Sequence, residues 1–150
     1  FSFLLFNFPK AKIFLGDGGA YFFGAVTALN IINTNNLNPG VSSFFFCVIL
    51  FYLFYEVFFS FFRKIYFKSP PLKPDSLHLH MLVFRLLKKV KISDNNNYLT
   101  SVVINFFYAF LILPAVLLND NGLFCRILFF VLIGLYTLIY INIYSAQKNG

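Results

Sequence analysis

The stretch that decides the fold is LFCRILFFVLIGLYTLIYINIY, residues 123–144, in which Arg126 is the only charged side chain. A second run, YLTSVVINFFYAFLILPAVLL at residues 98–118, holds no charged side chain at all. A helix of ~20 predominantly apolar residues is long enough to cross a bilayer. Only 11% of the 150 residues are charged, and the mean hydropathy is +0.77, whereas a soluble domain carries about 25% charged residues. The sequence therefore predicts an all-α, polytopic integral membrane protein.

Working outward from these two runs, polar clusters rich in Asn, Gly and Pro mark where the helices are interrupted. We expect about four membrane-spanning helices, at residues 18–32, 43–62, 98–118 and 123–144, and a long polar loop at 63–97 that contains an amphipathic helix. The chain opens on Phe1-Ser2-Phe3-Leu4-Leu5-Phe6, without Met and without a charged n-region. This opening is typical of the end of an earlier helix, so residues 1–150 are expected to be the C-terminal portion of one longer membrane domain.

The basic residues indicate the orientation in the membrane. With four crossings, the segment before the first span, the long loop and the C-terminal tail all lie on one side. Of the 12 lysines and arginines, only Arg126 falls at the opposite face. The positive-inside rule then places the long loop and the start of the first span in the cytoplasm. Because topology already accounts for the basic residues, we expect the lipid bilayer as a partner and no nucleic acid.

Asp17 lies in Leu15-Gly16-Asp17-Gly18-Gly19, where the first apolar helix begins. One interpretation is an ordinary helix N-cap, in which Asp accepts a hydrogen bond from a backbone N–H two or three residues on. The functional interpretation starts from the fact that helix N-termini favour anions. Glycines would let a phosphate come close, and a carboxylate can hold the Mg²⁺ that neutralises a pyrophosphate. Its predicted cytoplasmic position favours the second interpretation.

His78 and His80 are the chain's two histidines and follow Pro74-Asp75 in the long loop. In a helix two residues so spaced point to nearly opposite faces, whereas in an extended or irregular stretch they share one face. If both bind one ligand, the helix at 82–91 must begin after them or be distorted there. Imidazole nitrogens donate hydrogen bonds to phosphate oxygens. A zinc site is less favoured, because no third ligand lies nearby in the sequence. We expect a phosphate-binding role.

Glu56 falls within the second predicted span, where a carboxylate is a functional candidate by default. Pairing with a basic residue from helices outside this chain is an equally good interpretation.

Cys47 and Cys125 fit no metal-binding spacing. Both are expected toward the outer face, and packing is favoured over a disulfide between them.

The order of these motifs resembles the polyprenyl-phosphate N-acetylhexosamine-1-phosphate transferases, relatives of phospho-N-acetylmuramoyl-pentapeptide transferase. Their Phe/Leu-Gly-Asp-x-Gly motif is matched by residues 14–19, and their Pro-Asp-x-x-His-x-His-His loop by residues 74–81. Met81 stands where many members have another histidine. The family's Asp-Asp-x-x-Asp motif lies upstream in its members, and this chain has no such pair, because its four aspartates are isolated at positions 17, 75, 94 and 120.

The resemblance implies transfer of a sugar-1-phosphate from a UDP-N-acetylhexosamine to a polyprenyl phosphate such as undecaprenyl phosphate, with release of UMP, at a bacterial inner membrane. It implies Mg²⁺ as the cofactor, bound by Asp17 as the catalytic and metal-binding residue. Gly18, Gly19, His78 and His80 would bind the substrate phosphates. The 150 residues alone are expected to be inactive, and a homo-oligomer is compatible with the sequence.

Features of the sequence also fit two other functions. Glu56 within a span, together with glycine-interrupted helices, also fits a membrane transporter. A basic cytoplasmic loop also fits a non-catalytic membrane subunit that binds anionic lipid.

Overall fold

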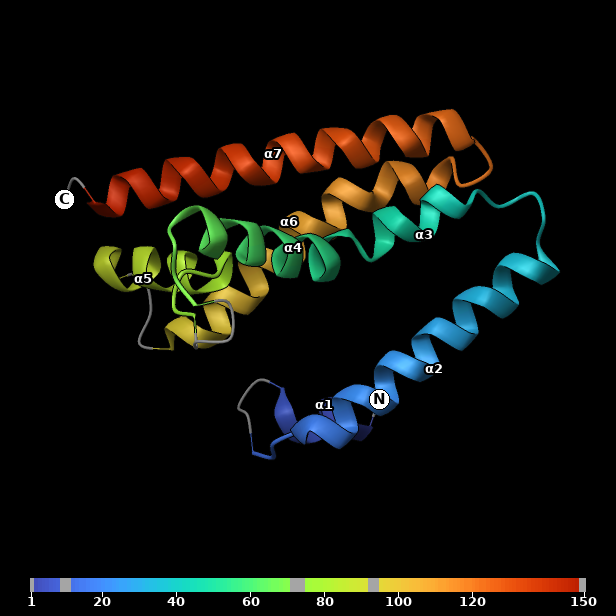
Figure 1. Cartoon of the computed structure of the whole chain (residues 1–150). Coiled ribbons are helices and arrows are strands. Elements are labelled where there is room, and N and C mark those ends of the chain that lie inside the picture. The colour runs from blue at the N-terminus through green and yellow to red at the C-terminus, as the bar shows by residue number, and fades with distance from the viewer. Residues whose placement is uncertain (1, 9–11, 71–74, 92–94, 149–150) are drawn as a thin grey trace.

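The computed structural model describes residues 2–8, 12–70, 75–91 and 95–148, and in these ranges every regular element is a helix. The predicted all-α class is confirmed to that extent. The helices are α1 Ser2–Asn7, α2 Gly16–Leu37, α3 Ser43–Ile49, α4 Phe51–Tyr66, α5 Leu79–Val90, α6 Asn96–Leu117 and α7 Gly122–Lys148. Figure 1 shows α7 running along the molecule above α3 to α6, while α2 lies apart from them.

Two helices, α6 and α7, are long and apolar enough to cross a membrane, and the bent pair α3 and α4 makes a third candidate span. They correspond to three of the four predicted spans. The first predicted span lies within α2, which is not among the candidates although it has 22 residues. Asp17 and several asparagines lower its hydropathy. The predicted loop at 33–42 is shorter than expected, because α2 continues to Leu37.

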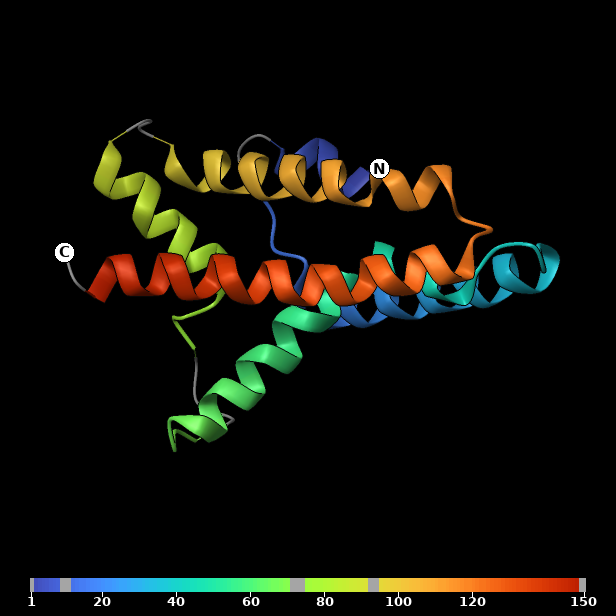
Figure 2. The same cartoon turned by 90° about the horizontal axis from the view of Figure 1, so that it is seen from above.

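The second predicted span is wrong as one continuous helix, because it is broken at Leu50. The axes of α3 and α4 differ in direction by 69°. Tyr108 of α6 enters the break: its hydroxyl donates to the carbonyls of Val48 (2.7 Å) and Ile49 (2.8 Å) and accepts the N–H of Tyr52 (3.3 Å). Broken helices are tolerated at membrane depth where protein groups satisfy the freed backbone. In Figure 2, α4 leaves obliquely from the direction of α7.

The two turns predicted to lie outside the membrane meet in space. Ser42 N–H donates to the carbonyl of Asn119 at 2.8 Å, which joins the α2–α3 connection to the α6–α7 turn. Asn121 Oδ1 accepts the N–H of Phe124 at 3.0 Å and caps the start of α7. Figure 1 shows these turns at one end of the molecule and α5 with the C-terminal end of α7 at the other.

The core lies where α7 packs against α3, α4, α5 and α6. It is formed by the buried side chains Val48, Phe51, Leu79, Leu82, Ala115, Cys125, Leu132, Tyr136 and Tyr140. Cys47 and Cys125 are both free; Cys125 is buried, as the packing interpretation predicted, whereas Cys47 is exposed.

The long loop is shorter than predicted at both ends, because α4 continues to Tyr66 and α6 begins at Asn96. The predicted amphipathic helix is confirmed as α5, which ends at Lys91 in the left-handed conformation (φ 55°). Its apolar side packs against α6 and α7 and buries Leu79 and Leu82. This packing holds the beginning of α5, with the two histidines, against the ends of the longer helices.

Candidate active site

Asp17 is the second residue of α2 and lies exposed in its first turn. The N-cap position is Leu15 instead, which makes no side-chain capping bond, so the N-cap interpretation of Asp17 is wrong. Gly16 has φ +67°, a conformation that favours glycine. Among the described residues, no hydrogen bond or ion pair involves the Asp17 carboxylate. An exposed carboxylate with unused acceptor capacity fits a hard cation such as Mg²⁺, which prefers oxygen ligands and retains several waters.

The two glycines after Asp17 differ in their surroundings. A Cβ atom at Gly18 would meet nothing within 4 Å, whereas one at Gly19 would lie 2.7 Å from Leu15 Cδ1. Gly18 therefore leaves open space beside Asp17, while a side chain at Gly19 would require the Leu15 side chain to shift. Only Gly18 presents the close-approach surface that the sequence predicts for both.

His78 and His80 lie side by side at the start of α5. His78 is the N-cap residue (φ −64°, ψ 149°), and the helix begins at Leu79, between the two histidines rather than after them. Their rings nevertheless stack with centroids 5.5 Å apart and planes 12° from parallel. The structure thus brings both imidazoles to one place, as a shared ligand requires. Pro74, which precedes them in the motif, lies outside the described residues.

Glu56 contacts the first of these histidines directly. Its Oε1 lies 2.8 Å from His78 Nδ1 and accepts the N–H of Leu79 at 2.9 Å, while its Oε2 accepts the hydroxyl of Tyr136 at 2.6 Å. Only 9% of Glu56 is exposed. The predicted pairing is found, but its partner is in this chain and is a histidine.

A second buried cluster holds the segment just before His78. Arg63 forms an ion pair with Asp75 and donates to the carbonyl of Leu77 and to the hydroxyl of Tyr140. Ser60 Oγ donates to Asp75 Oδ2 at 2.6 Å. The prediction that placed Arg63 in the loop is wrong, because α4 carries it and it is 8% exposed.

The charge of Asp75 is stabilised by these contacts. Burial alone would raise the pKa of its carboxyl. Hydrogen bonds from Ser60 and from the Leu77 N–H, together with the charges of Arg63 and His78, outweigh burial and hold this pKa below its ordinary value of 3.8. Asp75 is therefore an anion at neutral pH, and it neutralises the Arg63 guanidinium.

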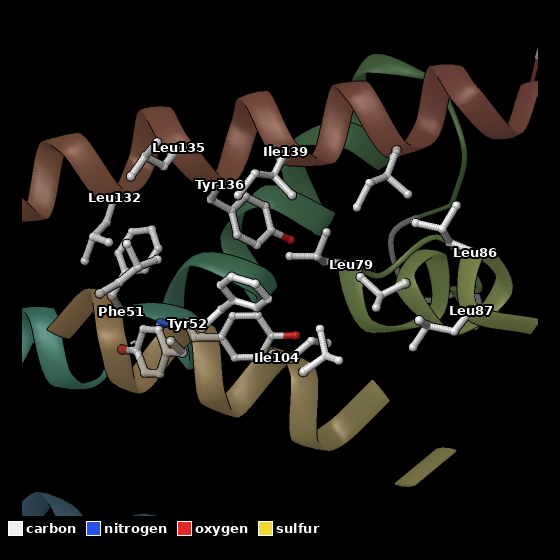
Figure 3. A pocket seen from close by; sticks show the side chains of 16 residues that line it. Phe51, Tyr52, Leu79, Leu86, Leu87, Ile104, Leu132, Leu135, Tyr136 and Ile139 are labelled. Carbon is white, nitrogen blue, oxygen red and sulfur yellow. Dashed lines mark hydrogen bonds between the residues drawn. The ribbon is translucent and has the colours of Figure 1, made fainter. Parts of the chain in front are cut away.

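An apolar cavity of about 340 Å³ lies between α4, α5, α6 and α7. It lies beside the segment that carries His78 and His80, called the histidine segment below. Figure 3 shows Leu79, Leu86 and Leu87 of α5 on one side and Leu132, Leu135 and Ile139 of α7 on another. Leu79 and Tyr136 line this cavity and also bond Glu56. The wall of the cavity therefore adjoins the contacts around Glu56 and His78.

The structure does not join the two predicted halves of the site. Within the described ranges, no hydrogen bond or ion pair links residues 17–19 to His78 or His80. The same ranges contain no group of three or more His, Cys, Asp or Glu side chains that could hold a metal ion. Among the described residues, Asp17 therefore belongs to no such group.

Residues 1–35 match the family model described as glycosyl transferase family 4. Over this segment the chain is similar to glycosyl transferase family 4. It is 34% identical over 90 residues to the undecaprenyl-phosphate alpha-N-acetylglucosaminyl 1-phosphate transferase of Thermotoga maritima, an alignment that covers 60% of this chain and 30% of that relative.

The chain is also similar to the probable undecaprenyl-phosphate N-acetylglucosaminyl 1-phosphate transferase of Bacillus subtilis. It is 31% identical over 96 residues, 61% of this chain and 26% of the relative. The aligned segment thus spans less than a third of either relative. No solved structure is significantly similar to the chain.

Sequence reasoning found some residues of this candidate site and missed others. The motifs pointed to both histidines, and the burial of a carboxylate in a span pointed to Glu56. Ser60, Arg63, Tyr136 and Tyr140 were missed, although Ser60 and Arg63 lie one and two turns after Glu56 in α4. A polar stripe at positions 56, 60 and 63 of a Phe-rich helix is the signal that could have found them.

Proposed function

We propose that this chain is the C-terminal part of a bacterial plasma-membrane enzyme that transfers N-acetylhexosamine-1-phosphate from a UDP-sugar to polyprenyl phosphate and releases UMP. The similarity of 60% of the chain to the Thermotoga maritima transferase carries this proposal. The exposed Asp17 and the stacked histidines supply residues suited to the phosphates of both substrates.

In the proposed reaction an oxygen of the lipid phosphate attacks the β-phosphorus of the UDP-sugar, and the bond to the bridging oxygen breaks as UMP leaves. Such a substitution needs positioning and charge neutralisation more than covalent work by the protein. His78 and His80 donate hydrogen bonds to phosphate oxygens, and Gly18 leaves room beside Asp17. Asp17 would hold Mg²⁺, which when bound supplies positive charge to the pyrophosphate.

The polyprenyl chain would lie in the apolar cavity between α4, α5, α6 and α7. This placement rests on two shared residues, because Leu79 and Tyr136 belong both to the cavity wall and to the contacts around Glu56 and His78. A hydrocarbon tail there would place its phosphate next to the histidines. The cytoplasmic side follows from the basic residues that accompany this end of the molecule.

The transporter alternative rested on a carboxylate within a span. That carboxylate, Glu56, accepts hydrogen bonds from α5 and α7, so it needs no transported ion to explain it. No observation favours the non-catalytic subunit over the transferase, and we propose the transferase alone.

The test is UMP release by membranes that carry the complete protein, supplied with UDP-N-acetylglucosamine and undecaprenyl phosphate, with and without Mg²⁺. We expect release that requires both the lipid and the metal. The variant Asp17→Asn should abolish release without lowering thermal stability, because the carboxylate is exposed. Asp120→Asn, the same change at an exposed turn, is the matched control and should keep full activity.

Two results would count against the proposal in different ways. If Asp17→Asn still releases UMP at the rate of the unchanged protein, Asp17 is not a metal ligand. If the folded, unchanged protein releases no UMP with any UDP-N-acetylhexosamine, the transferase function itself is wrong.

A further inference from the structure

Glu56 is the residue through which the membrane-spanning part of the molecule reaches the histidine segment. We propose that Glu56 is a positioning residue whose carboxylate accepts the Nδ1–H of the His78 imidazole and fixes its orientation, so that Nε2 faces the substrate phosphate and donates to it when the ring carries both protons. The inference rests on the proposed function, which gives His78 a phosphate to meet.

The three contacts of Glu56 determine which nitrogen of His78 carries a proton. The Leu79 N–H can only donate, and the Tyr136 hydroxyl donates to the other oxygen. An ionised carboxylate only accepts hydrogen bonds. The contact of 2.8 Å with His78 is therefore an Nδ1–H donated to Oε1. A hydrogen bond to one ring nitrogen sets the state of the other, and this one leaves Nε2 as the nitrogen that faces a ligand. A neutral ring protonated on Nδ1 has no proton on Nε2, so donation to a phosphate oxygen requires the doubly protonated ring.

The surroundings of Nε2 agree with this assignment. Its nearest charged atom is Asp75 Oδ2 at 3.8 Å, beyond hydrogen-bond distance. Asp75 is itself engaged by Arg63 and Ser60. The His78 side chain is 28% exposed, so a ligand can reach the ring edge that Glu56 does not contact.

The backbone around His78 is held by the same helix, α4. Arg63 binds the carbonyl of Leu77 just before His78, and Glu56 binds the N–H of Leu79 just after it. With Nδ1 also bound, both the main chain and the ring of His78 are fixed. His80 is exposed, and its contact in the described structure is the stacked ring of His78. Fixing His78 therefore also provides the surface on which His80 lies.

A purely structural role would not need a carboxylate at this depth. An ionisable group within a span is unfavourable unless it is paired, and apolar side chains of similar volume often stabilise a buried site as well as an ion pair does. A carboxylate that orients an imidazole is a common device in sites where the other ring nitrogen binds a ligand. Loss of such a partner typically lowers affinity or activity 10- to 100-fold, on the order of what we expect here.

The experiment compares Glu56→Gln, His78→Asn and the double variant in the complete protein, with UMP release as the readout. Glu56→Gln keeps an oxygen that can accept from both the Leu79 N–H and His78 Nδ1, so it preserves the fold and removes the negative charge beside the ring. We expect Glu56→Gln to lower kcat/KM about 10- to 100-fold, and the double variant to be no worse than His78→Asn alone, because Glu56 acts through His78. Tyr136→Phe is the control: it removes another contact of the same carboxylate and should leave the tautomer of His78 unchanged. Full additivity of the two losses, or wild-type kcat/KM in Glu56→Gln, would overturn the proposal.

A second readout does not depend on activity. NMR of the complete protein with ¹⁵N-labelled histidine, with His78 assigned through His78→Asn, reports which ring nitrogen is protonated. We expect the Nδ1–H tautomer in the unchanged protein and in Glu56→Gln, whose oxygen can still accept from Nδ1, and a smaller fraction of it in Glu56→Leu, which leaves Nδ1 without an acceptor. Equal tautomer fractions in Glu56→Leu and the unchanged protein would overturn the positioning role. If the tautomer changes while no UMP is ever released, the proposed function fails and the positioning of His78 by Glu56 stands.

Discussion

Asp75 is the residue on which the charge balance of the histidine segment depends. Its side chain and that of Arg63 are 8% and 6% exposed, so the two charges are largely removed from water. Removing one partner of a buried ion pair leaves an uncompensated buried charge, which costs about 3–5 kcal/mol of stability. The ion pair also holds the main chain before His78, because Arg63 donates to the carbonyl of Leu77, two residues after Asp75.

We expect Asp75→Asn to destabilise the complete protein by about 3 kcal/mol, measured by thermal unfolding in detergent, while Asp120→Asn has little effect. The pH dependence follows from the lowered pKa of Asp75. Its stabilising contribution is fully present above the ordinary value of 3.8 and is lost as the pH falls through the lower pKa of the folded state. The unchanged protein should therefore lose more stability than Asp75→Asn below about pH 4. Parallel pH curves for the two proteins would contradict this account.

At the same scale, the sequence predicts the chemistry of single residues better than their partners. His78, His80 and Glu56 were identifiable because their types are rare in an apolar chain. Their contacts were not, since Glu56 meets Tyr136 across 80 residues of sequence. Arg63 was misplaced because a cation after a Phe-rich run is typical of a helix end at the membrane surface, whereas here Asp75 and Leu77 return to cover it.

At the scale of elements, the break between α3 and α4 gives the region its shape. No Pro or Gly marks the break at Leu50, so sequence rules for helix ends predict a continuous helix there. The cause is tertiary: the Tyr108 hydroxyl from α6 satisfies the backbone groups that the break exposes. The lengths of α6 and α7, in contrast, follow from hydropathy alone, and their predicted bounds agree with the structure to within a few residues.

We expect Tyr108→Phe to destabilise the complete protein by about 1–3 kcal/mol, because it leaves two carbonyls and one N–H without their partner in a partly buried place. Tyr66→Phe, at a side chain that is 81% exposed, is the matched control and should change stability little. Thermal unfolding in the same detergent compares the two. Equal melting temperatures for Tyr108→Phe and the unchanged protein would show that the break forms without this hydroxyl.

At the scale of the whole molecule, chemistry and charge gather at one end. Figure 1 shows α5 and the C-terminal end of α7 at the end opposite the α2–α3 and α6–α7 turns. The basic residues of α5 lie at the end formed by α5 and the C-terminal end of α7. Arg126 lies near the opposite end, with its Cζ 5.0 Å from the centroid of the Phe44 ring. The hydrogen bond between Ser42 and Asn119 joins the two turns, so they lie on one side of any membrane that α6 and α7 cross.

This asymmetry predicts the orientation in the cell. In a variant without Cys47 and Cys125, a single cysteine at the α6–α7 turn (Asp120→Cys) should react with a membrane-impermeant maleimide on intact cells. A single cysteine on α5 (Lys89→Cys) should react only after permeabilisation, because positively charged segments remain in the cytoplasm. Both positions are exposed, so a difference in labelling reports the side of the membrane rather than burial. The opposite labelling pattern would place the histidine segment outside the cell, where no UDP-sugar is available to it, and would contradict the transferase function together with the topology.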